Sequence, residues 1–397
     1  MNKKILLLTS RYPLPAVGGE KLRIFKISEY LYNEGYTIDI ISLANTSTKN
    51  IQWPYGDSKV IKHKLIAKLT GTFKALLSGI PLQVGYYNSK EIAKLYNKAI
   101  KSSDYCATLC HLIRMFPYCE NNKIPVILEM TDAISLNYSR LIKPKNILEW
   151  IYKFEYRTVP TYEEHCINNC QQSVLVSSID KKFIEQRLNN KSSSNIQVIP
   201  NGVSLNKSPV IKTPDSLRIG FIGNMRSKQN EDAAIFFLEN IFPLVRKKHP
   251  TAEFLVIGAN PSNKLISAVK SQQRASLTYE VAEPSQVIKQ CFVTVAPMRY
   301  GAGMQNKVLE SMACGVPVVS SNYAYQGIKE LTEGKHLLVA DIQSPSSFVN
   351  AICRLKENEE LWETISQNAY NMCKNFFEWR KQLSTYKIII DNLNSKD

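Results

Sequence analysis

The chain has 397 residues, of which 44% are hydrophobic and 21% are charged, and its formal net charge is +16. This length predicts two or three domains, each with its own core, and it excludes a small fold held by disulfides. No stretch reaches the roughly 18 uncharged apolar residues of a membrane span, so we predict no transmembrane helix.

The positive charge predicts an anionic partner, for which nucleic acid, a membrane surface and phosphorylated small molecules are the options. Through Leu205 the sequence holds 27 Lys+Arg against 16 Asp+Glu, so most of the excess lies in the first half. The sequence contains no nucleic-acid recognition module and no interleaving of aromatic and basic residues, which argues against nucleic acid.

The start of the chain and its cysteines indicate the compartment. Residues Met1–Lys4 precede only a short apolar run, without the longer apolar region and cleavage site of a signal peptide. The nine cysteines form no paired framework, and the closest pairs, Cys106/Cys110 and Cys166/Cys170, lack partners at zinc-site spacing. We therefore expect reduced thiols, a cytoplasmic location and no metal site.

Short apolar runs alternate along the chain with longer segments of helical period, as in parallel sheets built from βαβ units. The runs expected as strands in the first half are 5–8, 37–43, 105–109, 126–130 and 173–177. In the second half they are 218–222, 253–257, 277–281, 293–297, 316–320 and 337–340. These runs predict an α/β protein of two doubly wound domains, 1–205 and 206–375. A C-terminal helix, 376–397, follows, and its return to the first domain is one option.

The first predicted strand leads into a proline-rich loop with the pair Gly18-Gly19, and a helix follows. Paired glycines before a helix N-terminus let backbone N–H groups approach a phosphate closely. The dinucleotide fingerprint G-x-G-x-x-G is absent, so we predict no NAD site.

The segment from Ser58 to Ser89 contains no acidic residue and combines lysines with apolar residues at helical spacing. The lysines are Lys59, Lys62, Lys64, Lys68 and Lys74, and the apolar residues are Ile61, Leu65, Leu69, Phe73 and Leu76. The pattern resembles a helix on an anionic membrane surface. Lys62 projects into the apolar stripe and Gly71 interrupts it, so a solvated helix packed on its own domain stays equally open.

The stretch VTVAPMRYGAGMQNKVLESMACGVPVVSS predicts a strand, a glycine-bearing loop, a helix and a second buried strand. Loop glycines Gly301 and Gly303 and the helix N-terminus offer N–H donors to an anion, and Arg299 and Lys307 add positive charge. Glu310 lies on the same helix, where a carboxylate can accept two hydrogen bonds from a ribose diol. The stretch therefore indicates a nucleotide site.

Several segments together resemble the group 1 glycosyltransferases, which have the GT-B fold of two Rossmann-like domains facing across a cleft. They are the stretch Ala296–Ser321, the turn Ile199–Val203, the segment Arg218–Met225 and the Gly18-Gly19 loop. The segments PLQVGYY, TDAISLNY and MRYGAGMQNKVLESMACG are most similar to the branch that makes bacterial capsule, exopolysaccharide or O-antigen. The resemblance covers nearly the whole chain.

This resemblance implies a transferase that moves a sugar from a nucleoside-diphosphate donor with retention at the anomeric carbon. The second domain would bind the nucleotide, and the first would present the acceptor. By position, Glu310 matches the ribose-binding glutamate of the family. The segment that faces the donor sugar and the diphosphate is matched by Gly303, Met304, Gln305, Asn306 and Lys307.

The chain departs from the family at two places. A second glutamate that the family often has is replaced by Ala302, so the donor sugar cannot be predicted. An expected arginine after the first strand of the second domain is replaced by Asn224, with Lys228 nearby. We assign Lys307 and Arg299 to the diphosphate and Lys228 as a further candidate.

Polar residues in the first domain follow predicted strand ends, where ligands of open α/β sheets bind. His111 and Asp132 are candidates to orient the acceptor hydroxyl or the donor sugar, and Arg114 is a candidate for donor binding, together with Gly18 and Gly19. Taken singly, each of these residues also has an ordinary structural explanation. We interpret Glu155, Arg157 and Glu163 as surface charges of a helix.

The chemistry that these residues predict is electrostatic stabilisation of a leaving diphosphate, without a metal, since the sequence lacks an Asp-x-Asp motif. We expect no cofactor beyond the nucleotide-sugar substrate, and a saccharide or a lipid-linked acceptor as the other partner. The anionic inner face of the cell membrane is a further expected partner. Two alternatives stay open, a nucleotide-sugar epimerase of the same fold and a non-catalytic scaffold.

Overall fold

The computed structural model describes most of the chain. The described residues are 3–16, 18–44, 52–102, 104–120, 123–140, 149–188, 195–205, 216–279, 281, 283–300 and 305–395. Packing divides the chain into two compact units. Unit 1 comprises Met1–Pro200 and Leu383–Asp397, and unit 2 comprises Asn201–Gln382.

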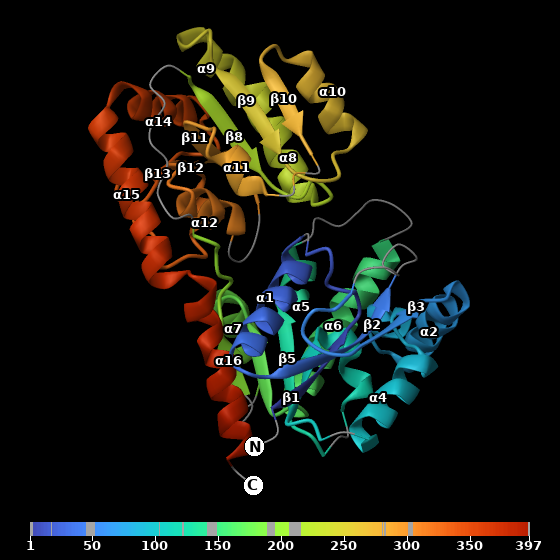
Figure 1. Ribbon diagram of the computed structural model, residues 1–397. Helices are drawn as coiled ribbons and strands as arrows, with labels where there is room; N and C mark the ends of the chain where they lie inside the picture. Colours follow the sequence, from blue (N-terminus) through green and yellow to red (C-terminus); the bar gives the residue numbers. More distant parts are fainter. Residues whose placement is uncertain are drawn as a thin grey trace. The chain divides into compact units, whose positions relative to one another are not determined.

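Unit 1 is built around a parallel sheet of seven strands in the order β3-β2-β1-β4-β5-β6-β7 (Figure 1). The strands are β1 (Lys4–Thr9), β2 (Thr37–Ala44), β3 (Ser58–Lys62), β4 (Ala107–His111), β5 (Val126–Thr131), β6 (Gln172–Leu175) and β7 (Ile196–Val198). The helices are α1 (Gly19–Asn33), α2 (Leu65–Ser78), α3 (Leu82–Tyr86), α4 (Lys90–Ser102), the 3₁₀ helix η2 (Ile113–Tyr118), α5 (Ile134–Arg140), α6 (Glu149–Asn168) and α7 (Ser178–Glu185). The central strands are buried along their length, as expected for a sheet covered on both faces.

Unit 2 contains a second parallel sheet, of six strands in the order β10-β9-β8-β11-β12-β13. The strands are β8 (Arg218–Ile222), β9 (Glu253–Ile257), β10 (Ala275–Thr278), β11 (Val293–Ala296), β12 (Val318–Ser320) and β13 (Leu338–Val339). The helices are α8 (Lys228–Phe236), the π-helical turn η4 (Phe237–Ile241), α9 (Phe242–Lys248), α10 (Asn263–Ser271), α11 (Pro284–Ile288), α12 (Asn306–Ala313), α13 (Asn322–Tyr325), α14 (Pro345–Glu357) and α15 (Glu359–Phe376). The last helix, α16 (Trp379–Asn394), begins in unit 2 and continues into unit 1.

The packing boundaries differ by a few residues from the sequence-based division at 205 and 375. Val203 donates its N–H to the Phe377 carbonyl at 2.7 Å and forms a bridge with Glu378. A side chain on Gly202 would collide with Trp379, since its Cβ would lie 2.5 Å from the Trp379 Cα. These contacts place the stretches 201–205 and 376–382 together within unit 2.

Two expectations about local structure are wrong. Ser58–Lys62 is an edge strand that pairs in parallel with β2, and the helix of the basic segment begins only at Leu65. Glu155 and Glu163 are buried rather than surface charges, while Arg157 is exposed as expected. Glu155 accepts a bond from the Gln83 N–H at 3.1 Å, and Glu163 accepts one from the Ser135 N–H at 3.1 Å. Both carboxylates thus connect α6 to preceding segments.

Candidate active site

His111 lies at the carboxyl end of β4 in unit 1 and is buried. Its Nδ1 atom is 3.0 Å from the Thr9 hydroxyl, at the end of the neighbouring strand β1. Burial, followed by the positive charges of Arg114, Arg23 and Arg11, holds the pKa of His111 well below its usual value, so the ring is neutral. Its Nε2 is buried and has no hydrogen-bond partner among the described residues.

Arg114 in η2 connects the end of β1 to the start of α1. Its Nε donates to the Ser10 hydroxyl at 2.9 Å, and a terminal nitrogen donates to Glu20 at 3.3 Å. Gly18 precedes α1 with a φ of 91°, a conformation that other residues rarely adopt. A Cβ added to Gly19 would meet no atom within 4 Å. The structure therefore brings Arg114 and the glycine pair to the same edge of the sheet as His111.

Asp132 is the first residue after β5 and is half-buried. Burial, together with the negative charge of Asp180, raises its pKa to about 7, and Arg23 opposes this shift. The preceding Thr131 has a φ of 64°, which is a strained conformation for a β-branched residue, and the strand register shifts between Glu129 and Thr131. Asp132 therefore directly follows a residue of strained backbone conformation and carries a carboxyl group with a pKa raised to about 7.

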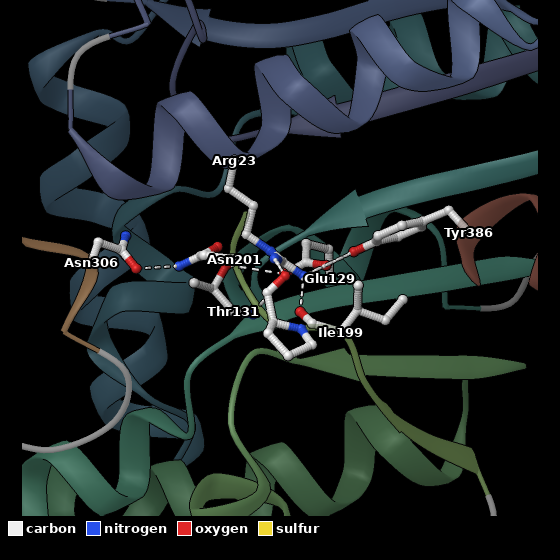
Figure 2. A network of polar contacts seen from close by, with 8 residues as sticks. Arg23, Glu129, Thr131, Ile199, Asn201, Asn306 and Tyr386 are labelled. Atoms are coloured by element: carbon white, nitrogen blue, oxygen red, sulfur yellow. Dashed lines mark hydrogen bonds and ion pairs between the residues drawn. The ribbon is translucent and has the colours of Figure 1, made fainter. Parts of the chain in front are cut away.

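A fully buried network lies beside these strand ends, centred on Arg23 of α1 and Glu129 of β5 (Figure 2). Arg23 also donates to the Ile199 carbonyl at 2.9 Å and lies within 3.2 Å of the Tyr386 hydroxyl in α16. Tyr386 donates to Glu129, which also accepts a bond from the Thr131 N–H at 3.0 Å. The network therefore holds the strained Thr131 turn that carries Asp132.

In unit 2, Lys307 and Glu310 lie one turn apart on α12, the helix that follows β11. Lys307 is buried, and its ammonium donates to the Gln305 side chain at 2.8 Å. Burial lowers the pKa of Lys307 to about 8, against the effect of Glu310, and burial raises the pKa of Glu310. The pair places a cation and a carboxylate together at the start of one helix.

The two residues before Lys307 begin this helix. Gln305 occupies the N-cap position of α12, and Asn306 accepts a bond from Asn201 at 3.2 Å within the same unit. Gly301, Gly303 and Met304, which the sequence assigns to donor binding, lie outside the described residues.

The guanidinium of Arg299 is engaged in an ion pair. Arg299 forms a two-point ion pair with Asp232 of α8, in which one bond is 2.8 Å, and its guanidinium lies 5.1 Å from the Phe236 ring centroid. Lys228 is exposed at the first position of α8, and its carbonyl accepts a bond from the Tyr300 hydroxyl at 3.3 Å. Arg299 and Tyr300 therefore both contact α8.

Two glycines at neighbouring strand ends of unit 2 are required by close packing. A Cβ on Gly258, after β9, would lie 1.7 Å from the Gly223 carbonyl oxygen, after β8. A Cβ on Gly223 would lie 2.7 Å from the Asn230 amide. Close packing therefore requires glycine at both positions, at the carboxyl edge where open α/β sheets bind nucleotides.

Within the described part of the chain, one group of side chains has the composition of a metal site. Ligand atoms of His249, Cys353 and Glu357 all lie within 4.8 Å of one another. His249 precedes β9, at the opposite edge of the sheet from Gly258. This group is therefore separate from the residues assigned to the nucleotide.

Sequence reasoning missed several of the polar residues that lie around His111, Arg114 and Asp132 in unit 1. Ser10 and Arg11 lie two and three residues after the first predicted strand, 5–8, so their place at the sheet edge was available from the pattern. Glu129 was a charged residue inside an apolar run, which indicates a buried partner. Nothing in the sequence pointed to Arg23 or Tyr386 as that partner.

Sequence comparison identifies what these units are similar to. Residues 216–358 match the family described as glycosyl transferases group 1. A protein encoded in the cps region of Klebsiella pneumoniae is 24% identical over 404 residues, covering 96% of this chain and 98% of that protein. An uncharacterised glycosyltransferase of Methanocaldococcus jannaschii is 25% identical over 293 residues, covering 72% of this chain and 76% of that protein.

Solved structures share the fold over the whole chain. Sucrose-phosphate synthase from Thermosynechococcus elongatus superposes with a TM-score of 0.74 at 13% identity and 100% coverage of both chains. TarM of S. aureus gives 0.72 at 12% identity, covering 98% of this chain and 99% of that chain. Anabaena HepE, solved in complex with UDP and glucose, gives 0.68 at 14% identity, covering 98% of this chain and 100% of that chain. The chain is thus a glycosyltransferase of the GT-B fold, and its second unit carries the group 1 glycosyl transferase domain.

Proposed function

We propose that the protein is a retaining, metal-independent glycosyltransferase that moves a sugar from a nucleoside-diphosphate donor to a saccharide or lipid-linked acceptor. Its biological role in this proposal is the synthesis of a surface polysaccharide, such as capsule or O-antigen. The cps-region relative supports that role, and the UDP complexes of HepE support the donor class.

The observation that carries this proposal is the arrangement of Lys307 and Glu310 on α12. A buried ammonium at a helix N-terminus stabilises the negative charge that grows on a leaving diphosphate, in a site from which water is excluded. Glu310, one turn further, is the carboxylate we assign to the ribose diol. The other donor-binding assignments in unit 2 are Arg299, Lys228, Gly301, Gly303, Met304, Gln305 and Asn306.

Unit 1 supplies the groups that we assign to the sugar and the acceptor. The unpartnered Nε2 of neutral His111 costs free energy while it is buried, and a hydroxyl of a bound sugar would relieve that cost. Asp132, with a pKa of about 7, is suited to hold an acceptor hydroxyl in place. Arg114, Gly18 and Gly19 are assigned to donor binding.

The reaction that we propose keeps the configuration of the anomeric carbon. The bond between sugar C1 and the phosphate oxygen breaks, and a bond between C1 and the acceptor oxygen forms on the same face. The proton of the acceptor hydroxyl moves to the departing phosphate oxygen, so that no protein nucleophile is required. Lys307 and Arg299 carry the charge of the leaving group, which is why no divalent cation or cofactor is included.

We propose a cytoplasmic location at the inner face of the membrane. All nine cysteines are free and buried, as is typical of proteins in a reducing compartment. Among the helices that the structure describes, none has both the length and the apolarity of a membrane span.

A transfer assay with a panel of nucleoside-diphosphate sugars tests the reaction. We expect turnover to survive excess EDTA, and NMR of the product to show the donor's anomeric configuration. Loss of turnover with EDTA and its recovery with a divalent ion would refute metal independence. An inverted product would refute retention while leaving the transferase activity intact.

Calorimetric titration of nucleoside diphosphate into wild type and Glu310→Gln tests the donor site. A carboxylate bonded to a ribose diol contributes about 1.5 to 3 kcal/mol, so its loss weakens binding about tenfold to a hundredfold. The matched control is Glu360→Gln, at the exposed start of α15, which we expect to leave affinity unchanged. Equal affinities of wild type and Glu310→Gln would remove the nucleotide from α12.

A further inference from the structure

Helix α2 is attached to unit 1 by one narrow face. Of its residues, only Gly71 and Ala75 are buried. A Cβ on Gly71 would lie 2.0 Å from the Gly85 carbonyl oxygen in α3, and a Cβ on Gly85 would lie 2.5 Å from the Ala75 Cβ. The two helices therefore touch through backbone. Gly71 does not interrupt an apolar stripe, as its sequence position suggested, but forms the contact on the opposite side.

The remaining face of α2 is apolar and exposed, and we call it the α2 apolar face. It consists of Leu65, Ile66, Leu69, Phe73, Leu76 and Leu77, which are 69%, 77%, 64%, 61%, 37% and 73% exposed. Among the described residues, the strongly exposed leucines all belong to this helix. Scattered surface leucines need no explanation, but six large apolar side chains on one helix face indicate an interaction surface.

Lysines border the α2 apolar face on both sides. At about 100° per residue, the six apolar residues cover about a third of the helix circumference. Lys74 follows about 60° beyond one edge of that arc, and Lys68 lies about 60° beyond the other. Lysines in this position extend their ammonium groups toward a polar boundary while their methylene groups stay with the apolar surface.

A basic hollow opens on the Lys74 side of the helix. It has a volume of about 230 Å³, and its lining includes Lys62, His63, Lys64, Lys74, Lys90 and Glu91. Lys64 is paired with Glu91 at 2.9 Å. The one carboxylate of the lining is therefore already engaged, and the lining holds three further lysines, Lys62, Lys74 and Lys90. This composition suits the phosphate of a lipid headgroup beside an apolar surface.

We propose that the α2 apolar face, with its bordering lysines and the basic hollow, docks the protein on an anionic phospholipid bilayer. This inference names the surface responsible for the proposed location at the membrane. It rests on the proposed function, because docking would give the enzyme access to a lipid-linked acceptor. The leucines and Phe73 enter the interfacial region, while Lys68, Lys74 and the hollow contact lipid phosphates. Charge complementarity favours the bilayer over a second copy, because a symmetric contact would bring like-charged lysines together.

Sedimentation of the full chain with vesicles tests the proposal. One set of vesicles contains phosphatidylglycerol and phosphatidylcholine, and the other contains phosphatidylcholine alone. We expect wild type to bind the anionic vesicles and to be released by high salt. Lys68→Glu/Lys74→Glu should weaken this binding at least thirtyfold, and Leu69→Gln/Phe73→Gln should weaken it comparably. The matched control is Lys264→Glu/Lys270→Glu, which makes the same charge change at exposed positions of α10. Its affinity for the anionic vesicles should fall by less than a factor of ten.

Four measurements on wild type and the variants separate the alternatives. Melting temperatures of the variants should stay close to that of wild type, because Leu69, Phe73 and Lys74 are exposed and Lys68 is only half-buried, with its ammonium 5.3 Å from the Tyr86 ring centroid. Equal vesicle binding by wild type and both α2 variants would overturn the proposal. So would a wild-type dimer that Leu69→Gln/Phe73→Gln dissociates, because that result assigns the face to a second copy. Nucleoside-diphosphate affinity, measured on the same variants, should stay unchanged, so a failure of the donor site would appear separately from a failure of docking.

Discussion

Arg23 and Glu129 form an ion pair whose two side chains are completely buried, with Nε 2.8 Å from one carboxylate oxygen (Figure 2). The same guanidinium bonds the Ile199 and Pro200 carbonyls, where the chain leaves unit 1, and the Tyr386 hydroxyl, where α16 has returned. One cation thus holds the segment at which the chain leaves unit 1 and the helix with which it returns.

Removing one partner of this pair should destabilise unit 1 strongly, because the other charge is left buried and unpaired. We expect Glu129→Gln or Arg23→Met to cost about 3 to 5 kcal/mol, and the double variant Arg23→Met/Glu129→Leu to cost less than the sum. Urea unfolding followed by tryptophan fluorescence measures this. Arg218→Gln, which breaks a partly exposed pair with Glu253, is the control and should cost about 1 kcal/mol or less. Additive single costs would show that the two side chains are not coupled.

The raised pKa of Asp132 predicts a pH-dependent stability. The folded-state pKa of about 7 exceeds the usual value of 3.8, so the folded protein binds the extra proton between these values. Stability from this group is present below about pH 4 and is lost as pH rises toward 7. Asp132→Asn should therefore raise the melting temperature at pH 8 and change it little at pH 4. It should also reduce transfer activity. A similar gain at both pH values would show that the carboxyl group is not protonated in the folded state.

The lowered pKa of Lys307 predicts how pH affects donor binding. The ammonium is protonated below about pH 8, so nucleoside-diphosphate affinity should fall as pH rises above 8. Calorimetry at several pH values measures the change. In Lys307→Gln the affinity should be lower and this pH dependence absent, with the larger loss in kcat if the cation faces the leaving group. An unchanged pH profile in the variant would assign the titration to another group.

The ion pair between Arg299 and Asp232 predicts opposite effects of two substitutions. Arg299 is 47% exposed, and such pairs contribute little to stability, so both variants should stay folded. Arg299→Gln should weaken diphosphate binding about tenfold, because a charged hydrogen bond to phosphate is lost. Asp232→Asn should strengthen binding a fewfold, since it releases the guanidinium and removes a nearby negative charge. If Arg299→Gln binds as tightly as wild type, the pair is only a surface contact.

Local sequence patterns determined the elements that build the sheets and the donor helix. Ile5–Leu8 and Arg218–Ile222 lie in strands β1 and β8 because short, largely apolar runs suit buried parallel strands. Lys307 and Glu310 are three residues apart, so any α-helix through them puts both on one side. The edge strands β3 and β7 escaped prediction, because they lack such apolar runs.

Tertiary structure alone decided which residues become partners across the fold. Arg23 and Glu129 are 106 residues apart, and Tyr386 is a further 257 residues from Glu129. They meet because strand order puts β5 near α1 and because α16 returns to unit 1. The basic segment shows the same limit, since its periodicity fitted both a membrane helix and a packed one. Only the Gly71–Gly85 contact determined which face of α2 is buried and left its leucines exposed, because burial depends on the neighbouring element and not on the helix itself.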